Sequence, residues 1–320
     1  MELPPLLRQA VDRALDGVAL ADLAEAATEL SQRYRAERRD GALHVGSRRD
    51  ALAYLAVRLP ATYAAVRASF EAAAVARPDF APKTVLDIGA GPGTALWAAA
   101  DCWSGLVEAL LVEASPAFRA CGEQLAAEAG LPSLTWRSAN IAKDDIDSAP
   151  RDLVTLAYVL NELDPDARPR VLERLWQLTA DTLIIVEPGT PAGWQRILAA
   201  RGQLIDAGAH VIAPCPHLHN CPLQAPDWCH FAERVARSRL HRQAKGAEVP
   251  WEDEKFSYVA LSRKPAPAAS ARIIARPRKG SGRVTLKLCR PDGSAGEQLF
   301  SRRDGDIYKR ASRSDWGETL

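Results

Sequence analysis

Apolar residues recur at helical spacing through the first eighty residues of the chain. They return every three or four positions, with a charged break at Arg35–Asp40. The pattern predicts a helical N-terminal region, residues 1–80, that covers an α/β core. Tyr54, Arg58 and Tyr63 are candidates to line a substrate groove beneath these helices.

From Pro82 to about Leu261 short apolar runs alternate with helical stretches. This alternation is typical of an α/β domain with a doubly wound parallel sheet, which we assign to residues 81–264. Helices are expected between the strands. The predicted strands are Thr84–Ile88, Glu108–Val112, Leu134–Arg137, Leu153–Ala157 and Thr182–Val186.

The last part of the chain, residues 265–320, has the pattern of a small β module. Pro265–Gly282 is rich first in Pro, Ala and Ser and then in Arg, Lys and Gly, so it reads as a linker that becomes a basic strand at Arg272–Arg276. Short alternating runs separated by Asp-Gly turns follow, the last of them at Ile307–Arg310. A small β-barrel is the predicted result.

The composition of the chain favours RNA as a partner and the cytoplasm as its compartment. The whole chain of 320 residues carries a net charge of only +1, but Arg272–Leu320 holds twelve Lys and Arg against six Asp and Glu. Such a basic tail favours RNA phosphates as its partner over a merely solvated face. No secretory leader and no apolar stretch of about 18 residues is present, so we expect a cytoplasmic protein without membrane contact.

Candidate chemistry begins at Thr84–Thr94, which reads Thr-Val-Leu-Asp-Ile-Gly-Ala-Gly-Pro-Gly-Thr. A strand ends in an acid, and glycines at every second position allow positive φ and the close approach of a ligand to the backbone. The spacing differs from the Gly-x-Gly-x-x-Gly of dinucleotide folds. It resembles the first motif of class I S-adenosylmethionine (SAM) methyltransferases, which have a Rossmann-like fold. The SAM-binding residues that this resemblance implies are Asp87, Gly89, Gly91, Gly93 and, at the end of the next strand, Glu113.

Further polar residues follow the third and fourth predicted strands. Asn140 follows the third, where this class often contacts the adenine. Asn161 and Glu162 follow the fourth, whose carboxyl end faces the methyl group in that class, although Asn161 is also suited to capping the helix from Asp164 onward. No Asn-Pro-Pro-Tyr motif is present, so the catalytic residues stay unassigned.

A cluster of unusual composition follows the fifth strand, at residues 213–231. Three cysteines, three histidines and four prolines fall within these nineteen residues. In a reducing compartment such cysteines favour a metal site over disulfides, and the prolines stiffen the loop. The predicted ligands are Cys215, Cys221 and Cys229, whose spacing matches no Cys-x2-Cys zinc knuckle and leaves the metal undecided.

A fourth ligand is needed, and the sequence offers two kinds. His217, His219 and His230 are near and favour zinc, whereas Cys289 lies in the tail and makes an all-thiolate site suited to [4Fe–4S]. Cys102 and Cys121 are expected to be ordinary helix residues.

Taken together, these segments give a resemblance that covers nearly the whole chain. The stretch Tyr54–Tyr63, the Asp87–Gly93 loop, the cysteine segment and Lys287–Arg290 resemble the methyltransferase-like small-ribosomal-subunit assembly family, which includes bacterial proteins and mitochondrial assembly factors. The resemblance implies SAM binding and a [4Fe–4S] cluster in preference to zinc. Its implied cluster ligands are Cys215, Cys221, Cys229 and Cys289.

Three functions remain compatible with the sequence. The first is a SAM-dependent methyltransferase acting on ribosomal RNA, in which the sulfonium makes the methyl carbon electrophilic and the enzyme aligns the acceptor with the C–S bond. The second is a non-catalytic assembly factor that binds SAM, a cluster and the small ribosomal subunit. The third is a small-molecule methyltransferase with a structural zinc, which would leave the basic tail unexplained. We expect a monomer in each case.

Overall fold

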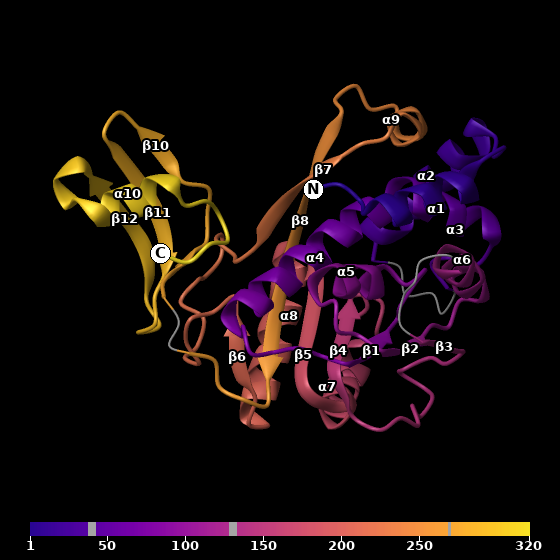
Figure 1. Ribbon diagram of the computed structural model, residues 1–320, viewed down its shortest axis with the longest axis horizontal. Helices are drawn as coiled ribbons and strands as arrows, with labels where there is room; N and C mark the ends of the chain where they lie inside the picture. Colours follow the sequence, from indigo (N-terminus) through magenta and orange to yellow (C-terminus); the bar gives the residue numbers. More distant parts are fainter. Residues whose placement is uncertain (38–42, 128–132, 268–269) are drawn as a thin grey trace.

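The computed structural model describes residues 1–37, 43–127, 133–267 and 270–320. These residues form a large mixed sheet with helices on both faces, and a smaller sheet at one side of it (Figure 1). Parts of the predicted charged break and of the predicted linker lie outside the described residues.

Eight strands of the described chain form the large sheet. They are β1 (Thr84–Ile88), β2 (Glu108–Val112), β3 (Ser133–Arg137), β4 (Arg151–Ala157), β5 (Thr179–Pro188), β6 (His210–Ala213), β7 (Phe231–Ala236) and β8 (Trp251–Ser262). Their order is β3-β2-β1-β4-β5-β8-β6, with β7 paired to β8. The first five run parallel, and β8 runs antiparallel to β5, β6 and β7.

This strand order is that of class I SAM methyltransferases, so the predicted fold class is confirmed. The sheet is mixed and not purely parallel, because β8 enters from the long β7–β8 hairpin and inserts beside β5. The order reverses between β1 and β4, and ligands of open α/β sheets bind at the carboxyl ends of strands at such a switch point.

Helices cover both faces of the sheet. They are α4 (Leu59–Ala76) and α5 (Thr94–Cys102) on one face and α7 (Arg168–Gln177) and α8 (Pro191–Asp206) on the other, with α6 (Pro116–Ala126) after β2. Alternate residues of β5 belong to the two buried clusters: Ile184 and Val186 to one, Leu183 and Ile185 to the other. This period of two is the burial pattern of a strand covered on both sides.

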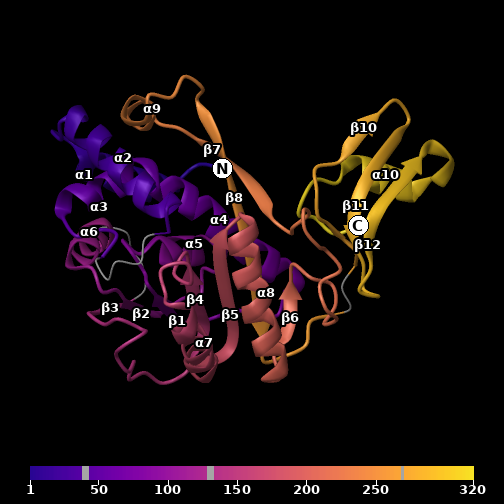
Figure 2. The same ribbon diagram turned by 180° about the vertical axis from the view of Figure 1, so that it is seen from behind.

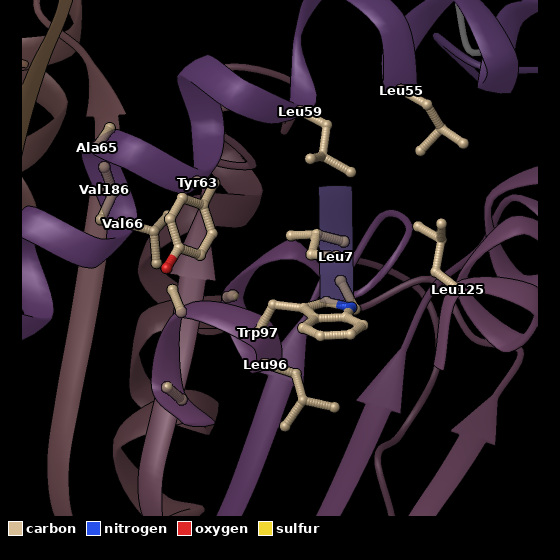
Figure 3. Packing of buried hydrophobic residues seen from close by; sticks show 14 of the residues in the cluster. Leu7, Leu55, Leu59, Tyr63, Ala65, Val66, Leu96, Trp97, Leu125 and Val186 are labelled. Atoms are coloured by element: carbon tan, nitrogen blue, oxygen red, sulfur yellow. The ribbon is translucent and has the colours of Figure 1, made fainter. Parts of the chain in front are cut away.

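The predicted N-terminal helices are present and share their core with the sheet domain. They are α1 (Pro5–Leu15), α2 (Leu20–Arg35), α3 (Arg48–Val57) and α4. Leu7 and Leu59 belong to the same buried cluster as Trp97 of α5 (Figure 3). Helix α3 begins with a capping box between Ser47 and Asp50, which satisfies backbone N–H groups at its start. None of the helices in the described ranges is long and apolar enough to cross a membrane.

The tail forms an open sheet, so the described residues give no support for the predicted barrel. Its elements are β9 (Arg272–Ile273), β10 (Arg278–Gly280), β11 (Arg283–Cys289), β12 (Ala295–Ser301) and helix α10 (Asp306–Arg313). The order is β10-β11-β12, with β9 also paired to β11. This tail module has a buried cluster of its own and lies at one side of the large sheet (Figure 2).

Two predicted strands of the tail differ from the structure. Strand β9 stops at Ile273, short of the predicted Arg276. Residues Ile307–Arg310 lie in helix α10 and not in a strand. Helix and strand are hard to separate by periodicity in so short a run, and burial of Ala311 in the cluster of the tail module favours the helix.

Candidate functional site

A cavity of about 1250 Å³ lies at the carboxyl ends of β1, β2 and β4. Its floor comes from the strand ends and the glycine loop after β1. Helices α2 and α3 and the hairpin that carries α9 (Arg239–Lys245) form the opposite wall. The cavity therefore lies at the switch point of the sheet and beneath the N-terminal helices.

The three glycines of the loop all have positive φ, of 65°, 55° and 82° at Gly89, Gly91 and Gly93. A Cβ at Gly89 would lie 2.4 Å from Val159 Cγ2, so this glycine is required for packing. At Gly91 the nearest neighbour is Phe118, at 3.9 Å, so the space beside this glycine belongs to the cavity. Gly93 is the N-cap of α5 and not part of the cavity wall.

Two of the predicted SAM-binding acids, Asp87 and Glu113, line the cavity floor. Asp87 is buried, and its Oδ1 accepts a hydrogen bond of 2.5 Å from Thr155, while Oδ2 has no partner among the described residues. Burial, and to a lesser extent the charge of Glu113, raise the pKa of Asp87 to about 7, although the hydrogen bond from Thr155 lowers it. The Glu113 carboxylate accepts from the backbone N–H groups of Gly91 at 2.8 Å and Ser115 at 2.7 Å.

Asn140, Asn161 and Glu162 also line the cavity. The Asn140 side chain accepts from Ala142 N at 3.0 Å and so shapes the turn after β3. Asn161 does not cap the following helix, since the N-cap residue there is Asp164.

Glu162 is an exposed acid of the cavity. Its side chain is open to water within the cavity, and no hydrogen bond or ion pair joins its carboxylate to another residue of the described ranges. Enclosure by the cavity walls raises the pKa of Glu162 to about 8, and the carboxylates of Glu113 and Glu187 add to the rise.

A polar group that the sequence did not predict joins the floor of the cavity to the opposite wall. Tyr158, which follows β4, has a positive φ of 60°, and its hydroxyl donates to Glu254 Oε1 at 2.9 Å. Arg58 Nη2 lies 3.4 Å from the same oxygen. Strained non-glycine backbone of this kind is concentrated at functional sites. Glu254 belongs to β8, almost a hundred residues further on, so no local signal could have found the pair.

Of the residues predicted to line a groove, Tyr54 and Arg58 lie in the cavity wall. Tyr63 does not, because it is buried in the core and its hydroxyl donates to Asp101 at 3.0 Å.

A second, much smaller cavity of about 30 Å³ lies between the loop after β6 and the tail module. All four predicted metal ligands line it: Cys215, Cys221, Cys229 and Cys289. Burial and the other cysteines raise the pKa of Cys289 to about 12, and that of Cys229 also rises well above its usual value. These thiols therefore resist ionisation unless a positive charge enters between them.

Of the three nearby histidines, only His217 lines this cavity, and its Nε2 lies 3.3 Å from Cys289 Sγ. His230 stacks on Trp228 and meets Trp316 of the tail edge-on. His219 packs beside Gly293, which would place a Cβ 3.1 Å from it.

The donors of this cavity are not arranged around one ion. Within the described ranges, no three or more His, Cys, Asp or Glu side chains are grouped closely enough to hold a single metal ion. A tetrahedral zinc would require its sulfurs to be about 3.8 Å apart, given Zn–S bonds of about 2.3 Å. A cubane cluster takes one thiolate at each of four irons and so accepts sulfurs that are further apart.

Two curated relatives resemble most of the chain. It is 32% identical over 294 residues to the human mitochondrial ribosome assembly protein METTL17, covering 84% of this chain and 62% of that protein. It is 22% identical to the mitochondrial Rsm22-cox11 tandem protein 2 of Schizosaccharomyces pombe, over 83% of this chain and 42% of that one. The chain thus spans less than two thirds of the length of either relative.

Solved structures resemble the chain only distantly. Magnesium protoporphyrin IX methyltransferase of Synechocystis, with bound SAM, is 15% identical over 78% of this chain and all of that one, with a TM-score of 0.42. The fold assignment therefore rests on the strand order alone. The family of the mitochondrial small ribosomal subunit protein Rsm22 matches residues 48–320. Because this match and the human relative both extend over most of the sequence, the chain belongs to the Rsm22 family of methyltransferase-like ribosome assembly proteins.

Proposed function

We propose that the protein binds SAM and a [4Fe–4S] cluster and acts on the small ribosomal subunit during its assembly. The observation that carries the proposal is the coexistence of a cavity at the switch point of the sheet beside the glycine loop, a four-cysteine cavity and a basic tail in one chain of the Rsm22 family. The relatives are named as mitochondrial proteins. For this chain we propose a cytoplasmic monomer.

The residues of the large cavity fit SAM. Gly91 leaves the loop open to a ligand, Glu113 is positioned by the loop it faces, and Asp87 offers a buried oxygen without a partner among the described residues. In the proposed complex, Glu113 accepts from the ribose hydroxyls, Asp87 faces the amino-acid moiety beside Gly89 and Gly91, and Gly93 holds the start of α5. Asn140 borders the adenine. When bound, SAM supplies an electrophilic methyl carbon.

The residues of the small cavity fit an anionic metal centre. Four thiols line it, and two of them have strongly raised pKa values that bound metal would reverse. We propose the cluster in preference to zinc because the four cysteines match the cluster ligands that the family resemblance implies. A site completed by Cys289 would connect the tail module to the core. We propose residues 265–320 as a separate unit on the basis of their own buried cluster, whereas residues 1–80 and 81–264 share one core.

The basic tail is the proposed contact with ribosomal RNA. Arg302, Arg303, Lys309 and Arg310 are exposed on and before α10. Their density favours phosphate contacts, which are sequence-independent and weaken with salt. RNA bound there lies outside the cavity, so the tail is proposed to position the subunit and not to carry chemistry.

The proposal has two versions, an enzyme that methylates ribosomal RNA and a non-catalytic assembly factor, and they differ in whether methyl transfer takes place. The cavity has a strained Tyr158 and an open Glu162 beside the proposed cofactor, which favours an enzyme. A cofactor loop supports binding equally well without transfer, which is the second version.

Comparing a strain that lacks the gene with its parent tests both versions. We expect fewer mature small subunits in the deletion strain and, for the enzyme, loss of one methyl group from ribosomal RNA measured by mass spectrometry. The strain is then complemented with the wild type, with Gly91→Val, or with charge reversal at the four tail cations. If the Gly91→Val protein restores subunit assembly but not the methyl group, methyl transfer takes place in the wild type and is not needed for assembly. Normal assembly and methylation in the deletion strain would refute the proposal.

A further inference from the structure

Two buried arginines line the cysteine cavity, one from each side. Arg201 lies on α8 and is 4% exposed, and Arg272 lies on β9 and is 8% exposed. Arg201 donates to the backbone carbonyl oxygens of His217 at 2.7 Å and His219 at 2.9 Å. Arg272 donates to those of Pro214 at 3.0 Å and Gly317 at 2.7 Å. Both guanidinium groups therefore brace the cysteine loop.

Neither arginine forms an ion pair with a carboxylate in the described part of the chain, and Arg201 Nε is buried without a hydrogen-bond partner. Asp227 of the cysteine loop and Asp292 of the turn between β11 and β12 have other partners. Asp227 pairs with Lys287, and Asp292 accepts from Ser294 N at 2.8 Å. Because arginine stays protonated, two positive charges are buried at this cavity without a counter-charge.

Burying an unpaired charge costs several kcal/mol in a folded protein. Other buried arginines of the chain avoid this cost. Arg77, 2% exposed, pairs with Asp79 at 2.8 Å, and Arg196 pairs with Glu187 at 2.6 Å. The exception at the cysteine cavity therefore points to a negative charge within it.

We propose that Arg201 and Arg272 are charge-compensating residues of an anionic four-thiolate centre, and that Arg272 makes docking of the tail module depend on that charge. The inference rests on the proposed metal centre. Four thiolates around a [4Fe–4S]²⁺ core or a Zn²⁺ ion leave a net charge of about −2, which two guanidinium groups balance. Cys289 on β11 would attach the tail module by ligating the metal centre. Arg272, its partner on the paired strand β9, would attach it by attraction to the negative charge of that centre.

The test compares Arg201→Gln with Arg201→Lys in the full chain, purified without oxygen. Gln removes the charge and keeps an amide donor, whereas Lys keeps the charge. We expect metal loss to an added chelator to become about tenfold faster in Arg201→Gln, with much of the difference restored in Arg201→Lys. If iron is present, the midpoint potential of the cluster should fall in Arg201→Gln, since a nearby positive charge favours the reduced form.

Arg77→Gln is the matched control, because it removes an equally buried arginine that has carboxylate partners and lies outside both cavities. It should lower the melting temperature without changing metal loss or potential. Arg272→Gln should, in addition, increase proteolysis of the tail in the loaded protein.

The outcomes separate this inference from the function on which it rests. Wild-type protein that holds neither iron nor zinc refutes the metal centre and the inference together. Wild-type protein that holds metal, with unchanged metal loss in Arg201→Gln, refutes the inference alone. Equal losses in Arg201→Gln, Arg201→Lys and Arg77→Gln would assign the effect to stability and also refute it.

Discussion

The two cavities of this protein differ in what holds their walls in place. The larger one is built from the ends of β1, β2 and β4, whose positions are set by the sheet. The smaller one is closed by a loop and by strands of the tail that pack over α8 and β8, and its cysteines Cys229 and Cys289 are sixty residues apart in sequence. The first is ready for a ligand when the sheet has formed, whereas we expect the second to depend on the proposed metal centre to stay closed.

The charges around the cavities show the same contrast. In the larger cavity Glu162 is open to water and Glu113 accepts backbone hydrogen bonds, so we expect this cavity to tolerate the absence of its ligand better. The smaller cavity contains thiols with raised pKa values and arginines without counter-charges. Losing the proposed metal centre should therefore destabilise the protein more than losing SAM does.

The largest effect is expected from Cys289→Ser. Serine keeps a hydrogen-bond partner for His217 Nε2 but cannot provide a thiolate, so the change isolates ligation. Because metal binding contributes directly to folding, we expect a loss of about 3 kcal/mol or more in stability and faster proteolysis of the tail. Wild type purified without oxygen should be brown and hold about four irons and four sulfides per chain, and the variant should lose the colour or become labile to oxygen.

Cys102→Ser and Cys121→Ser are the controls for this change, since neither cysteine lines the small cavity. Both should keep colour and tail protection. A colourless wild type with one zinc per chain, retained by His230 and not by Cys289, would contradict the iron–sulfur assignment.

A smaller effect, confined to SAM, is expected from Gly91→Val. The side chain would enter the open side of the loop, where only Phe118 lies within 4 Å, so the protein should fold. Steric overlap with the ligand should weaken SAM binding about a hundredfold by calorimetry. Gly208→Val is the matched control, since Gly208 also has positive φ, of 85°, with nothing within 4 Å and no place in the cavity. Equal SAM affinity in all three proteins would remove the assignment of the loop.

The sequence predicts the larger cavity better than the smaller one, because most of its floor comes from short, local motifs. The Asp87–Gly93 motif is local, and the strands at Thr84–Ile88 and Glu108–Val112 begin and end as predicted. Distant contributions to the same cavity, such as Tyr158 to Glu254, have no local signal. At the small cavity the cysteines stand out by composition, but Arg201 is one arginine of an ordinary helix, and only the packing of α8 against the loop reveals it.

The smallest effect concerns charge in the larger cavity and comes from Glu162. In the ligand-free protein its pKa is raised to about 8, so much of the side chain is neutral at pH 7. The sulfonium of SAM is a cation and favours the ionised carboxylate, so the bound-state pKa must be lower than the free one. SAM affinity should therefore rise by about tenfold between pH 6.5 and pH 8.5, and this gain is lost as pH falls through the bound-state pKa. The charged and titratable groups around it are Glu113, Glu187, Arg33, Tyr34 and Tyr54.

S-adenosylhomocysteine, the product of methyl transfer, separates Glu162 from these neighbours. It lacks the sulfonium charge but keeps the ammonium group, so acids that face the ammonium affect both ligands alike, and the difference between their pH profiles reports on the sulfonium. Glu162→Gln should remove that difference, and Glu162→Asp should keep part of it. Calorimetry of both ligands across the pH range measures it. Identical profiles for SAM and S-adenosylhomocysteine in the wild type would mean that Glu162 does not sense the sulfonium, while leaving SAM binding itself intact.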